Sequence, residues 1–225
     1  MQKMAAIDSE TAPLRPSRAL PLPRYWRTAA RELARRDAIL RVFIRRSEGL
    51  PLRSRGDAFQ TLARAIVGQQ ISVKAAQSVW NRLAAELGTV APAGVLGARN
   101  EALRGCGLSR QKVLYIQDLA RHFDNGTLGA TGWDTLDDEA LIAELTRVKG
   151  IGRWTAEIFL IFFLGRPDVL PLHDLGLQRA INLHYGNGRA LTPSRMRRIA
   201  AAWKPWRSVA TWYLWRSLDP ISAAG

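Results

Sequence analysis

Apolar residues recur every three or four positions along most of this 225-residue chain. One such stripe occupies residues 59–67 behind Asp57, and another occupies residues 113–123 behind Ser109. This spacing places the apolar side chains on one face of an α-helix, and a polar residue just ahead of the stripe can cap it. Sustained apolar/polar alternation, the pattern of a half-buried strand, does not occur. The sequence therefore predicts an all-α fold.

The same signals predict several more helices. Polar caps precede apolar stripes elsewhere in the chain, and prolines favour the first turn of a helix. The expected helices are those after Ser72, after Asp137 or Asp138, over residues 155–164 and 174–185, and two announced by Thr192-Pro193 and by Pro205. The Gly- and Ala-rich stretch between Gly88 and Ser109 is expected to be a connection.

Composition narrows the class of protein. Hydrophobic residues make up 47% of the chain, enough for a core in one large domain or two small lobes. The longest apolar run, residues 158–164, is far shorter than the roughly 20 residues that cross a bilayer, so no membrane span is expected. Cys106 is the only cysteine, which excludes an internal disulfide and a cysteine-ligated metal site. We expect a cytoplasmic protein.

Charge points to the kind of partner. Lys and Arg number 33 against 19 Asp and Glu, which gives a net charge of +14. The isoelectric point is near 11.2. Such a surface attracts a polyanion, either nucleic acid or an anionic membrane. Residues 1–20 contain several Pro and Arg and lack the apolar core of a secretory signal, so they are expected to form a flexible basic arm.

The segment VKGIGRWTAE, residues 148–157, predicts a helix-hairpin-helix. Gly150 and Gly152 would keep the turn narrow, and Ile151 would plug the space between the two helices. Amides at the start of the second helix would then face a DNA phosphate, helped by the positive charge of Lys149 and Arg153. Alternatively, a GxG sequence is merely a tight helix connection. The basic chain, the apolar plugs and Thr155-Ala156 opening the second helix favour the DNA-binding interpretation.

Several segments together resemble the helix-hairpin-helix DNA glycosylase superfamily, specifically its alkylated-base branch, the DNA-3-methyladenine glycosylase II type. They are AIVGQQISVKAAQSVWNRL (65–83), GLSRQK (107–112), GIGRWTAE (150–157), DVLPLHDLGLQRAI (168–181) and TPSRMRRIAAAWKPWRSVATWYLW (192–215). Longer members of this branch carry an additional mixed α/β domain before the helical part, whereas only about 50 residues precede Asp57 here.

The resemblance implies two helical lobes with a cleft between them and the hairpin at the cleft mouth. Residues 21–225 would form the glycosylase domain, with lobe one over about 56–165 and lobe two over about 21–55 plus 166–225. The implied partner is double-stranded DNA containing alkylated bases, such as 3-methyladenine and 7-methylguanine. The protein would act as a monomer, associated with the nucleoid, in base excision repair.

Asp174 is the residue that the resemblance assigns to catalysis. Cleavage of an N-glycosidic bond develops positive charge on the sugar, which an ionised carboxylate stabilises while it orients or deprotonates a water. A single acid suffices when the leaving base is already cationic. The alternative role of Asp174 is that of a helix N-cap. Asp168 is interpreted as a turn or cap residue, and His173 as a residue that merely borders the site.

The resemblance also assigns Trp154 and Trp215 to the walls of the base pocket. An indole face attracts a cationic alkylated base by about 0.5 to 2 kcal/mol. Superfamily members that also cut the strand carry a lysine where this chain has Trp154, so hydrolysis without lyase activity is expected. Trp206 and Trp212 are assigned to support of the pocket, and the packing interpretation is preferred for Trp26, Trp80, Trp133 and Trp203.

Other DNA contacts follow from the resemblance. The base must leave the duplex, and Arg110, beside Ser109, is the expected side chain that fills the gap. An N-capped turn accounts equally well for this loop. Gln69 and Gln70 are expected near the DNA-facing cleft, with ordinary solvated helix residues as the alternative. No cofactor and no metal are required, although the hairpin carbonyls of such proteins suggest a site for Na⁺ or K⁺.

Two other functions are consistent with parts of the pattern. A non-catalytic helix-hairpin-helix protein would bind DNA without chemistry. A glycosylase for mismatched or oxidised bases is disfavoured by Trp154 and by the lack of a cysteine cluster.

Overall fold

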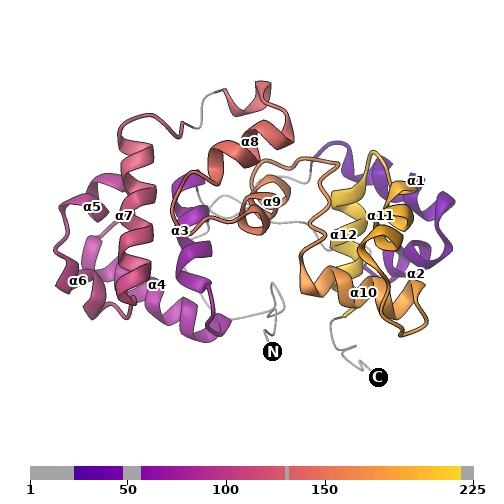
Figure 1. The fold of residues 1–225 in the computed structure, drawn as a ribbon, viewed down its shortest axis with the longest axis horizontal. Coiled ribbons are helices and arrows are strands. Elements are labelled where there is room, and N and C mark those ends of the chain that lie inside the picture. Colours follow the sequence, from indigo (N-terminus) through magenta and orange to yellow (C-terminus); the bar gives the residue numbers. More distant parts are fainter. Residues whose placement is uncertain (1–22, 48–56, 130–131, 219–225) are drawn as a thin grey trace. The chain divides into compact units, whose positions relative to one another are not determined.

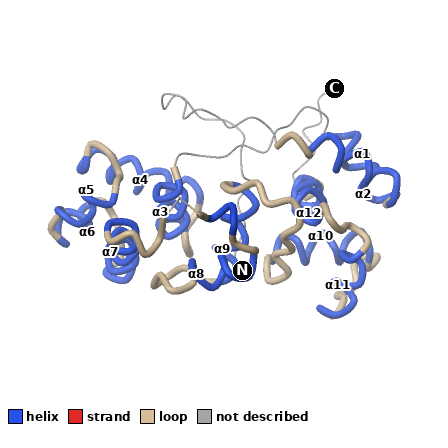
Figure 2. Tube along the Cα trace, turned by 90° about the horizontal axis from the view of Figure 1, so that it is seen from above, coloured by secondary structure: helices blue, strands red, loops and turns tan. Residues whose placement is uncertain are grey.

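The computed structural model describes residues 23–47, 57–129 and 132–218. These residues form α-helices, one 3₁₀ helix and loops, and no strand is found among them (Figures 1 and 2). The all-α prediction is therefore confirmed. The helices are α1 (Trp26–Arg36), α2 (Ala38–Arg46), α3 (Ala58–Gly68), α4 (Val73–Leu87), α5 (Pro92–Gly97), α6 (Asn100–Gly105), α7 (Arg110–Asp124), η1 (Trp133–Thr135), α8 (Asp138–Leu145), α9 (Arg153–Phe162), α10 (Leu175–Tyr185), α11 (Pro193–Ala201) and α12 (Arg207–Arg216).

Capping side chains begin most of the predicted helices. Asp57 accepts from Gln60 N in the first turn of α3, and Asp137 starts α8 by accepting from Ala140 N. The caps of α4, α7 and α11 are Ser72, Ser109 and Thr192. These bonds satisfy amides that have no acceptor inside the helix.

Three expectations about local structure were wrong. The helix after the glycine pair begins at Arg153 and ends at Phe162, so residues 155–164 were placed too late. Pro205 lies ahead of Trp206, the N-cap of α12, and not in the first helical turn. The stretch between Gly88 and Ser109 contains the short helices α5 and α6, whose six residues each give too little periodicity to be read from sequence.

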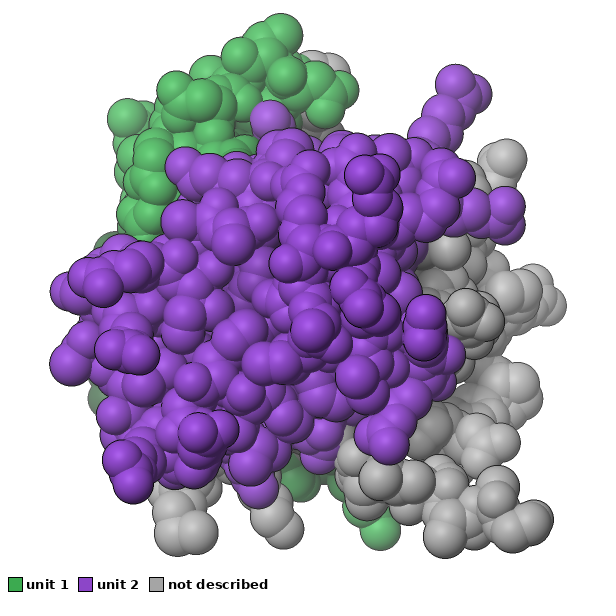
Figure 3. All heavy atoms as spheres, turned by 90° about the vertical axis from the view of Figure 1, so that its right-hand side faces the viewer, with its two compact units in different colours: residues 1–5, 12–18, 55–159 green, residues 6–11, 19–54, 160–225 purple. Residues whose placement is uncertain are grey.

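The chain divides into two compact units, coloured separately in Figure 3. Among described residues, unit 1 comprises 57–159 and unit 2 comprises 23–47 with 160–218. The division falls inside α9, upstream of the predicted lobe boundary at residue 165.

A row of packed aromatic rings lies in the core of unit 1. Phe123 packs edge-on against Phe59 and Trp133, and Trp133 packs edge-on against Phe159, with ring centroids 5.4 to 6.4 Å apart. Edge-to-face aromatic pairs of this kind add to the stabilisation from burial alone. This core holds α3, α7, η1 and α9 together.

Unit 2 has α12 at its centre. This helix contacts α1, α2 and α10, all of which are labelled in Figure 1. Most of its residues are buried. Trp26 of α1 packs edge-on against Trp212 of α12. Asp37 caps α2 and also accepts from Tyr185 Oη and Trp203 Nε1, at 2.7 and 3.1 Å. The predicted packing role is confirmed for Trp26, Trp80, Trp133 and Trp203, which are all buried.

Candidate active site and nucleic-acid interface

The predicted hairpin is present between α8 and α9. Leu145, Val148 and Ile151 are buried, as expected for apolar plugs between the two helices. Ala156 N donates to Gly152 O at 3.1 Å, which closes the first turn of α9. The start of an α-helix presents amides without an acceptor inside the helix, so this end of α9 favours an anion.

The two hairpin glycines have different structural requirements. Gly150 has φ +85°, and a Cβ there would overlap the ring of Tyr115 on α7. A Cβ at Gly152 would meet no heavy atom of the described residues within 4 Å. The protein's own packing therefore requires glycine at position 150. At position 152 the absence of a side chain leaves the backbone open to close approach from outside the described fold.

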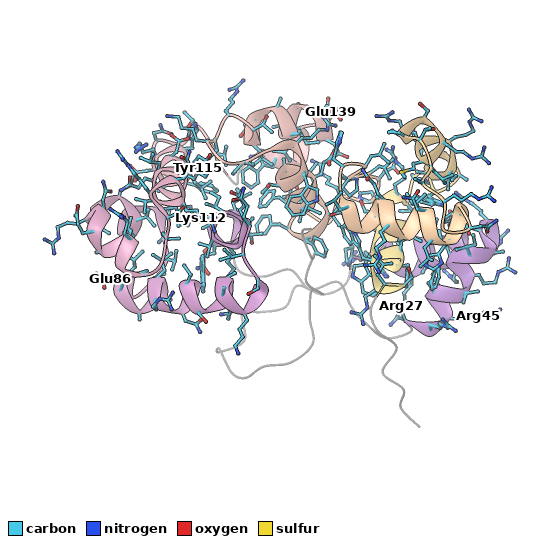
Figure 4. All side chains as sticks on the ribbon, turned by 60° about the horizontal axis from the view of Figure 1, so that its bottom comes forward. Arg27, Arg45, Glu86, Lys112, Tyr115 and Glu139 are labelled. Carbon is cyan, nitrogen blue, oxygen red and sulfur yellow. The ribbon has the colours of Figure 1, made fainter. Side chains whose placement is uncertain are left out.

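One face of α7 braces the hairpin. Lys112, Tyr115 and Asp118 are spaced three residues apart, which places them on one side of the helix. Asp118 Oδ2 accepts from Lys149 N at 2.9 Å, while the Tyr115 ring covers Gly150. Figure 4 labels Lys112 and Tyr115 on this helix. The spacing of these residues was visible in the sequence, but their partners were not.

Lys112 and Gln69 connect the end of α3 to the same hairpin. Lys112 Nζ donates to Val67 O and Gln69 O, both at 2.7 Å. Burial lowers the pKa of Lys112. Gln69 Nε2 in turn donates to Gly150 O at 2.7 Å, so this side chain is not the solvated residue of the alternative interpretation.

The turn after Gln69 carries an unusual backbone and an exposed apolar side chain. Gln70 has φ +59°, a conformation uncommon for a residue other than glycine. Ile71 is 40% exposed. Gln69, at the start of this turn, is fixed by its hydrogen bonds with Gly150 O and Lys112 Nζ. Ile71 did not enter the sequence prediction because exposure of a single apolar residue cannot be read from periodicity.

Arg153 is less available to DNA than its charge suggested. Its guanidinium forms a fork with Glu139, with Nη1 at 2.8 Å, and its Nε donates to Glu157 at 2.9 Å. The hydrogen bond to Glu139 is the largest cause of a raised pKa of Arg153. The same bond lowers the pKa of Glu139. Lys149 is exposed, whereas the Thr155 side chain is buried, so a DNA contact at position 155 would use the backbone.

Asp174 lies at the start of α10 in unit 2, where its predicted N-cap role is confirmed. It is the N-cap of α10, with Oδ1 accepting from Leu177 N at 2.6 Å. The same oxygen accepts from Trp215 Nε1 at 2.7 Å. Asp174 is only 2% exposed, but its neighbours His173 and Leu175 are both exposed. The buried carboxylate therefore lies at a helix N-terminus, between two exposed residues of the sequence.

The two predicted pocket tryptophans differ in environment. Trp154 is 39% exposed in the first turn of α9. Trp215 is 8% exposed and stacks on Phe162, with ring centroids 5.6 Å apart and planes 12° apart. The role of Phe162 was missed, because nothing in the apolar run 158–164 distinguishes it. Trp206 stacks on Tyr25 and Trp212 packs edge-on against Trp26, so these ring contacts lie in the packing around α1, and the predicted support of the pocket stays a prediction.

Ser109 and Asp168 have structural partners. Ser109 Oγ caps α7 by accepting from Lys112 N at 3.2 Å, and Arg110 beside it is exposed. Asp168 is fixed by a fork with Arg207, at 2.7 and 2.9 Å, in keeping with its assignment as a turn residue.

The described residues contain no group of three or more His, Cys, Asp or Glu side chains suited to a metal ion. At the hairpin, Gly150 O already accepts from Gln69, and Gly152 O from Ala156. A monovalent cation there would have to share these oxygens, and its presence stays a prediction. None of the described helices is long and apolar enough to cross a bilayer.

Comparison with known proteins places this fold and hairpin in one class. Residues 63–207 match the family model described as HhH-GPD superfamily base excision DNA repair protein. The chain belongs to this superfamily.

Individual relatives are similar over most of the chain. DNA-3-methyladenine glycosylase 1 of Schizosaccharomyces pombe is 31% identical over 165 residues, which cover 72% of each chain. A crystal structure of DNA-3-methyladenine glycosidase from Bacillus halodurans is 36% identical, with a TM-score of 0.77 over 84% of this chain and 88% of that one. The S. pombe 3-methyladenine DNA glycosylase in complex with abasic DNA gives 27% identity and a TM-score of 0.72, over 84% of this chain and 96% of that one.

Proposed function

We propose that this protein is a monofunctional DNA glycosylase that hydrolyses the N-glycosidic bond of alkylated bases in duplex DNA, initiating base excision repair. The relatives named above are called 3-methyladenine glycosylases, and one of them is bound to abasic DNA, the product expected of such a reaction. The observation that carries the proposal is the carboxylate of Asp174, held at a helix N-terminus by Leu177 N and Trp215 Nε1.

Asp174 would stabilise the developing sugar cation. Its Oδ1 is fixed by two donors, so the carboxylate needs little reorganisation when charge appears on the sugar. Its burial strengthens that interaction, because a charge removed from water is screened less. The carboxylate would also orient the attacking water.

Trp154 would stack on the extruded base. It is the more exposed of the two predicted pocket tryptophans, and a cationic alkylated purine gains attraction from an indole face that a neutral base lacks. Trp215 would act chiefly through its edge, by holding Asp174, and would contribute its ring as a wall supported by Phe162. A pocket that selects by charge and stacking accepts several alkylated bases.

The hairpin would hold the DNA backbone. The first-turn amides of α9 and the exposed Lys149 present positive potential, and the bare backbone at Gly152 permits close approach of a phosphate. Such contacts fix the position of the enzyme without reading sequence.

Two side chains are candidates to fill the gap left by the extruded base. Arg110 is exposed at the start of α7. Ile71 is exposed in the Gln70 turn, which Gln69 ties to the hairpin, and an apolar wedge between base steps is a recognised way to separate them. Slower base extrusion in Ile71→Ser, but not in Arg110→Ser, would assign the gap to Ile71.

Lyase chemistry is not expected, because the resemblance to the superfamily places Trp154 where a strand-cutting enzyme carries its nucleophilic lysine. Hydrolysis would leave an intact abasic site and no covalent intermediate. Borohydride trapping of the protein on damaged DNA would contradict this part of the proposal.

The decisive experiment is release of free bases from methylated duplex DNA, separated by chromatography. The native chain is expected to release 3-methyladenine and 7-methylguanine as a monomer. Asp174→Asn should lose most of this activity, while Asp124→Asn, which removes an exposed carboxylate at the end of α7, should not. No release by the native protein would favour a DNA-binding protein without chemistry. Unchanged release by Asp174→Asn would reject the catalytic assignment.

A further inference from the structure

The positive charge of this protein is concentrated in one of its two units. Among described residues, unit 2 contains 17 Lys and Arg and four Asp and Glu, whereas unit 1 contains 11 of each kind. The hairpin belongs to unit 1. The charge that attracts a polyanion is therefore largely separate from the motif expected to bind DNA.

An arginine ridge lies on α1, defined as Arg24, Arg27, Arg31 and Arg35. Arg27, Arg31 and Arg35 follow one another at intervals of four residues, so their side chains share one face of α1, and Arg24 lies in the turn just before the helix. All are exposed, whereas Trp26, Ala29 and Leu33 on another face of the helix are buried in the core of unit 2. Figure 4 labels Arg27 of this ridge and Arg45, an exposed residue in the last turn of α2.

The acidic side chains Glu32 and Asp37, which are close to the ridge in sequence, form hydrogen bonds with residues outside it. Glu32 accepts from Arg36 at 2.6 Å and from Trp206 Nε1 at 2.8 Å. Asp37 caps α2 and accepts from Tyr185 and Trp203. Among described residues no ion pair to the ridge is found.

The ridge carries charges of one sign only. A surface that serves only solubility usually intersperses both signs of charge. Like charges four residues apart destabilise a helix. The pairs Arg27–Arg31 and Arg31–Arg35 both carry this cost, which a bound polyanion would reverse.

The dimensions of the ridge fit a DNA strand. Arg27 and Arg35 are eight residues apart, which is about 12 Å along a helix. One strand of duplex DNA presents three or four phosphates over that length of its axis. Arginine is also the side chain whose planar fork matches phosphate geometry.

The ridge is separate from the carboxylate within unit 2. The central helix α12 contacts both α1 and α10. Its Trp212 packs on Trp26 of α1, and its Trp215 donates to Asp174, the N-cap of α10. The ridge lies on the side of α1 away from this core. It therefore cannot line a pocket around Asp174.

We propose that the arginine ridge of α1 is an additional binding surface for the DNA phosphate backbone, which contacts duplex away from the damaged nucleotide. It would supply sequence-independent affinity and support sliding along DNA. The choice of DNA over another polyanion rests on the proposed function.

The test measures how the affinity for a long undamaged duplex depends on salt, by fluorescence anisotropy. Each lost phosphate contact lowers the slope of log K against log salt by about 0.9. Arg27→Gln/Arg31→Gln should therefore lower the slope by about 2, and Arg31→Gln/Arg35→Gln by a similar amount. Single-turnover excision at saturating damaged DNA should be unchanged. The matched control is Arg99→Gln/Arg104→Gln, which removes two exposed arginines at α6 of unit 1.

Several outcomes would overturn the proposal. One is an unchanged slope in the ridge variants, and another is an equal fall in the control, which would reveal a general effect of net charge. A third is loss of binding to vesicles of anionic phospholipid with the DNA slope intact, which would assign the ridge to a membrane. Thermal unfolding of each variant establishes that it is folded. Because the DNA is undamaged, the ridge and the glycosylase activity can fail independently.

Discussion

Trp215 and Asp174 lie 41 residues apart in the sequence and are joined by a hydrogen bond of 2.7 Å from Nε1 to Oδ1. The bond orients the carboxylate, and the stack of Trp215 on Phe162 fixes the indole in turn. Trp215→Phe removes the donor and keeps an aromatic ring against Phe162. A hydrogen bond to a charged group contributes about 1.5 to 3 kcal/mol, so we expect the excision rate to fall about 10- to 100-fold.

Single-turnover kinetics with saturating DNA measure this effect. Trp212→Phe is the control, because Trp212 packs on Trp26 and Tyr213; it should lower the melting temperature more than the rate. A native rate in Trp215→Phe would show that the indole only fills space.

Trp154 should matter most for cationic bases. Trp154→Ala removes the exposed indole, and we expect excision of 7-methylguanine to fall about 2- to 30-fold more than excision of neutral ethenoadenine. The two substrates are compared at equal saturation. Equal losses on both would show that Trp154 contributes shape alone.

The hairpin glycines should separate folding from binding. Gly150→Ala imposes a left-handed backbone on a residue with a side chain and overlaps Tyr115, so we expect a loss of about 1 to 3 kcal/mol in the free energy of unfolding. Gly152→Ala meets no described neighbour and should fold like the native chain but bind DNA more weakly. Chemical denaturation and DNA titration of both variants check this, and the reverse pattern would refute it.

Lys112 is expected to keep the hairpin that would contact DNA rigid. Lys112→Met leaves Val67 O and Gln69 O without their donor, at a cost of about 1 to 3 kcal/mol. Because Gln69 also holds Gly150 O, we expect weaker binding to damaged and undamaged DNA alike, and faster amide exchange at Lys149 and Gly150. Lys74→Met, at an exposed lysine of α4, is the control. Unchanged amide exchange at the hairpin would show that loss of the Lys112 hydrogen bonds does not loosen the hairpin.

Acid should destabilise unit 2 through His184. Burial lowers the pKa of this imidazole from its ordinary 6.5, and its ring packs on Phe43 while Nε2 contacts Ser217 Oγ. Below the ordinary pKa the unfolded chain takes up a proton that the folded chain resists, so stability falls as pH drops through this range. Melting temperatures between about pH 8 and pH 5 should show this fall, and His184→Gln should reduce it. An identical pH profile in the variant would assign the acid sensitivity to other groups.

The class of fold and the candidate catalytic acid were both visible in the sequence. Helices were predictable because their signals are local: Asp57, Ser109 and Thr192 cap residues only three positions ahead, and the apolar stripes mark one face. Asp174 could be identified as a helix cap for the same reason, and its catalytic assignment came from resemblance of the surrounding segment to a family. The short helices α5 and α6 were missed because six residues complete less than two turns.

The sequence by itself determined the helices, the hairpin and the excess of positive charge, because each depends on residue types and spacings within a short segment. Only the tertiary structure decided that Trp215 bonds to Asp174, that Gln69 and Lys112 brace the hairpin, and that Glu139 pairs with Arg153. These contacts join residues that the packing of buried side chains brings together, and no local pattern records which partner will be met.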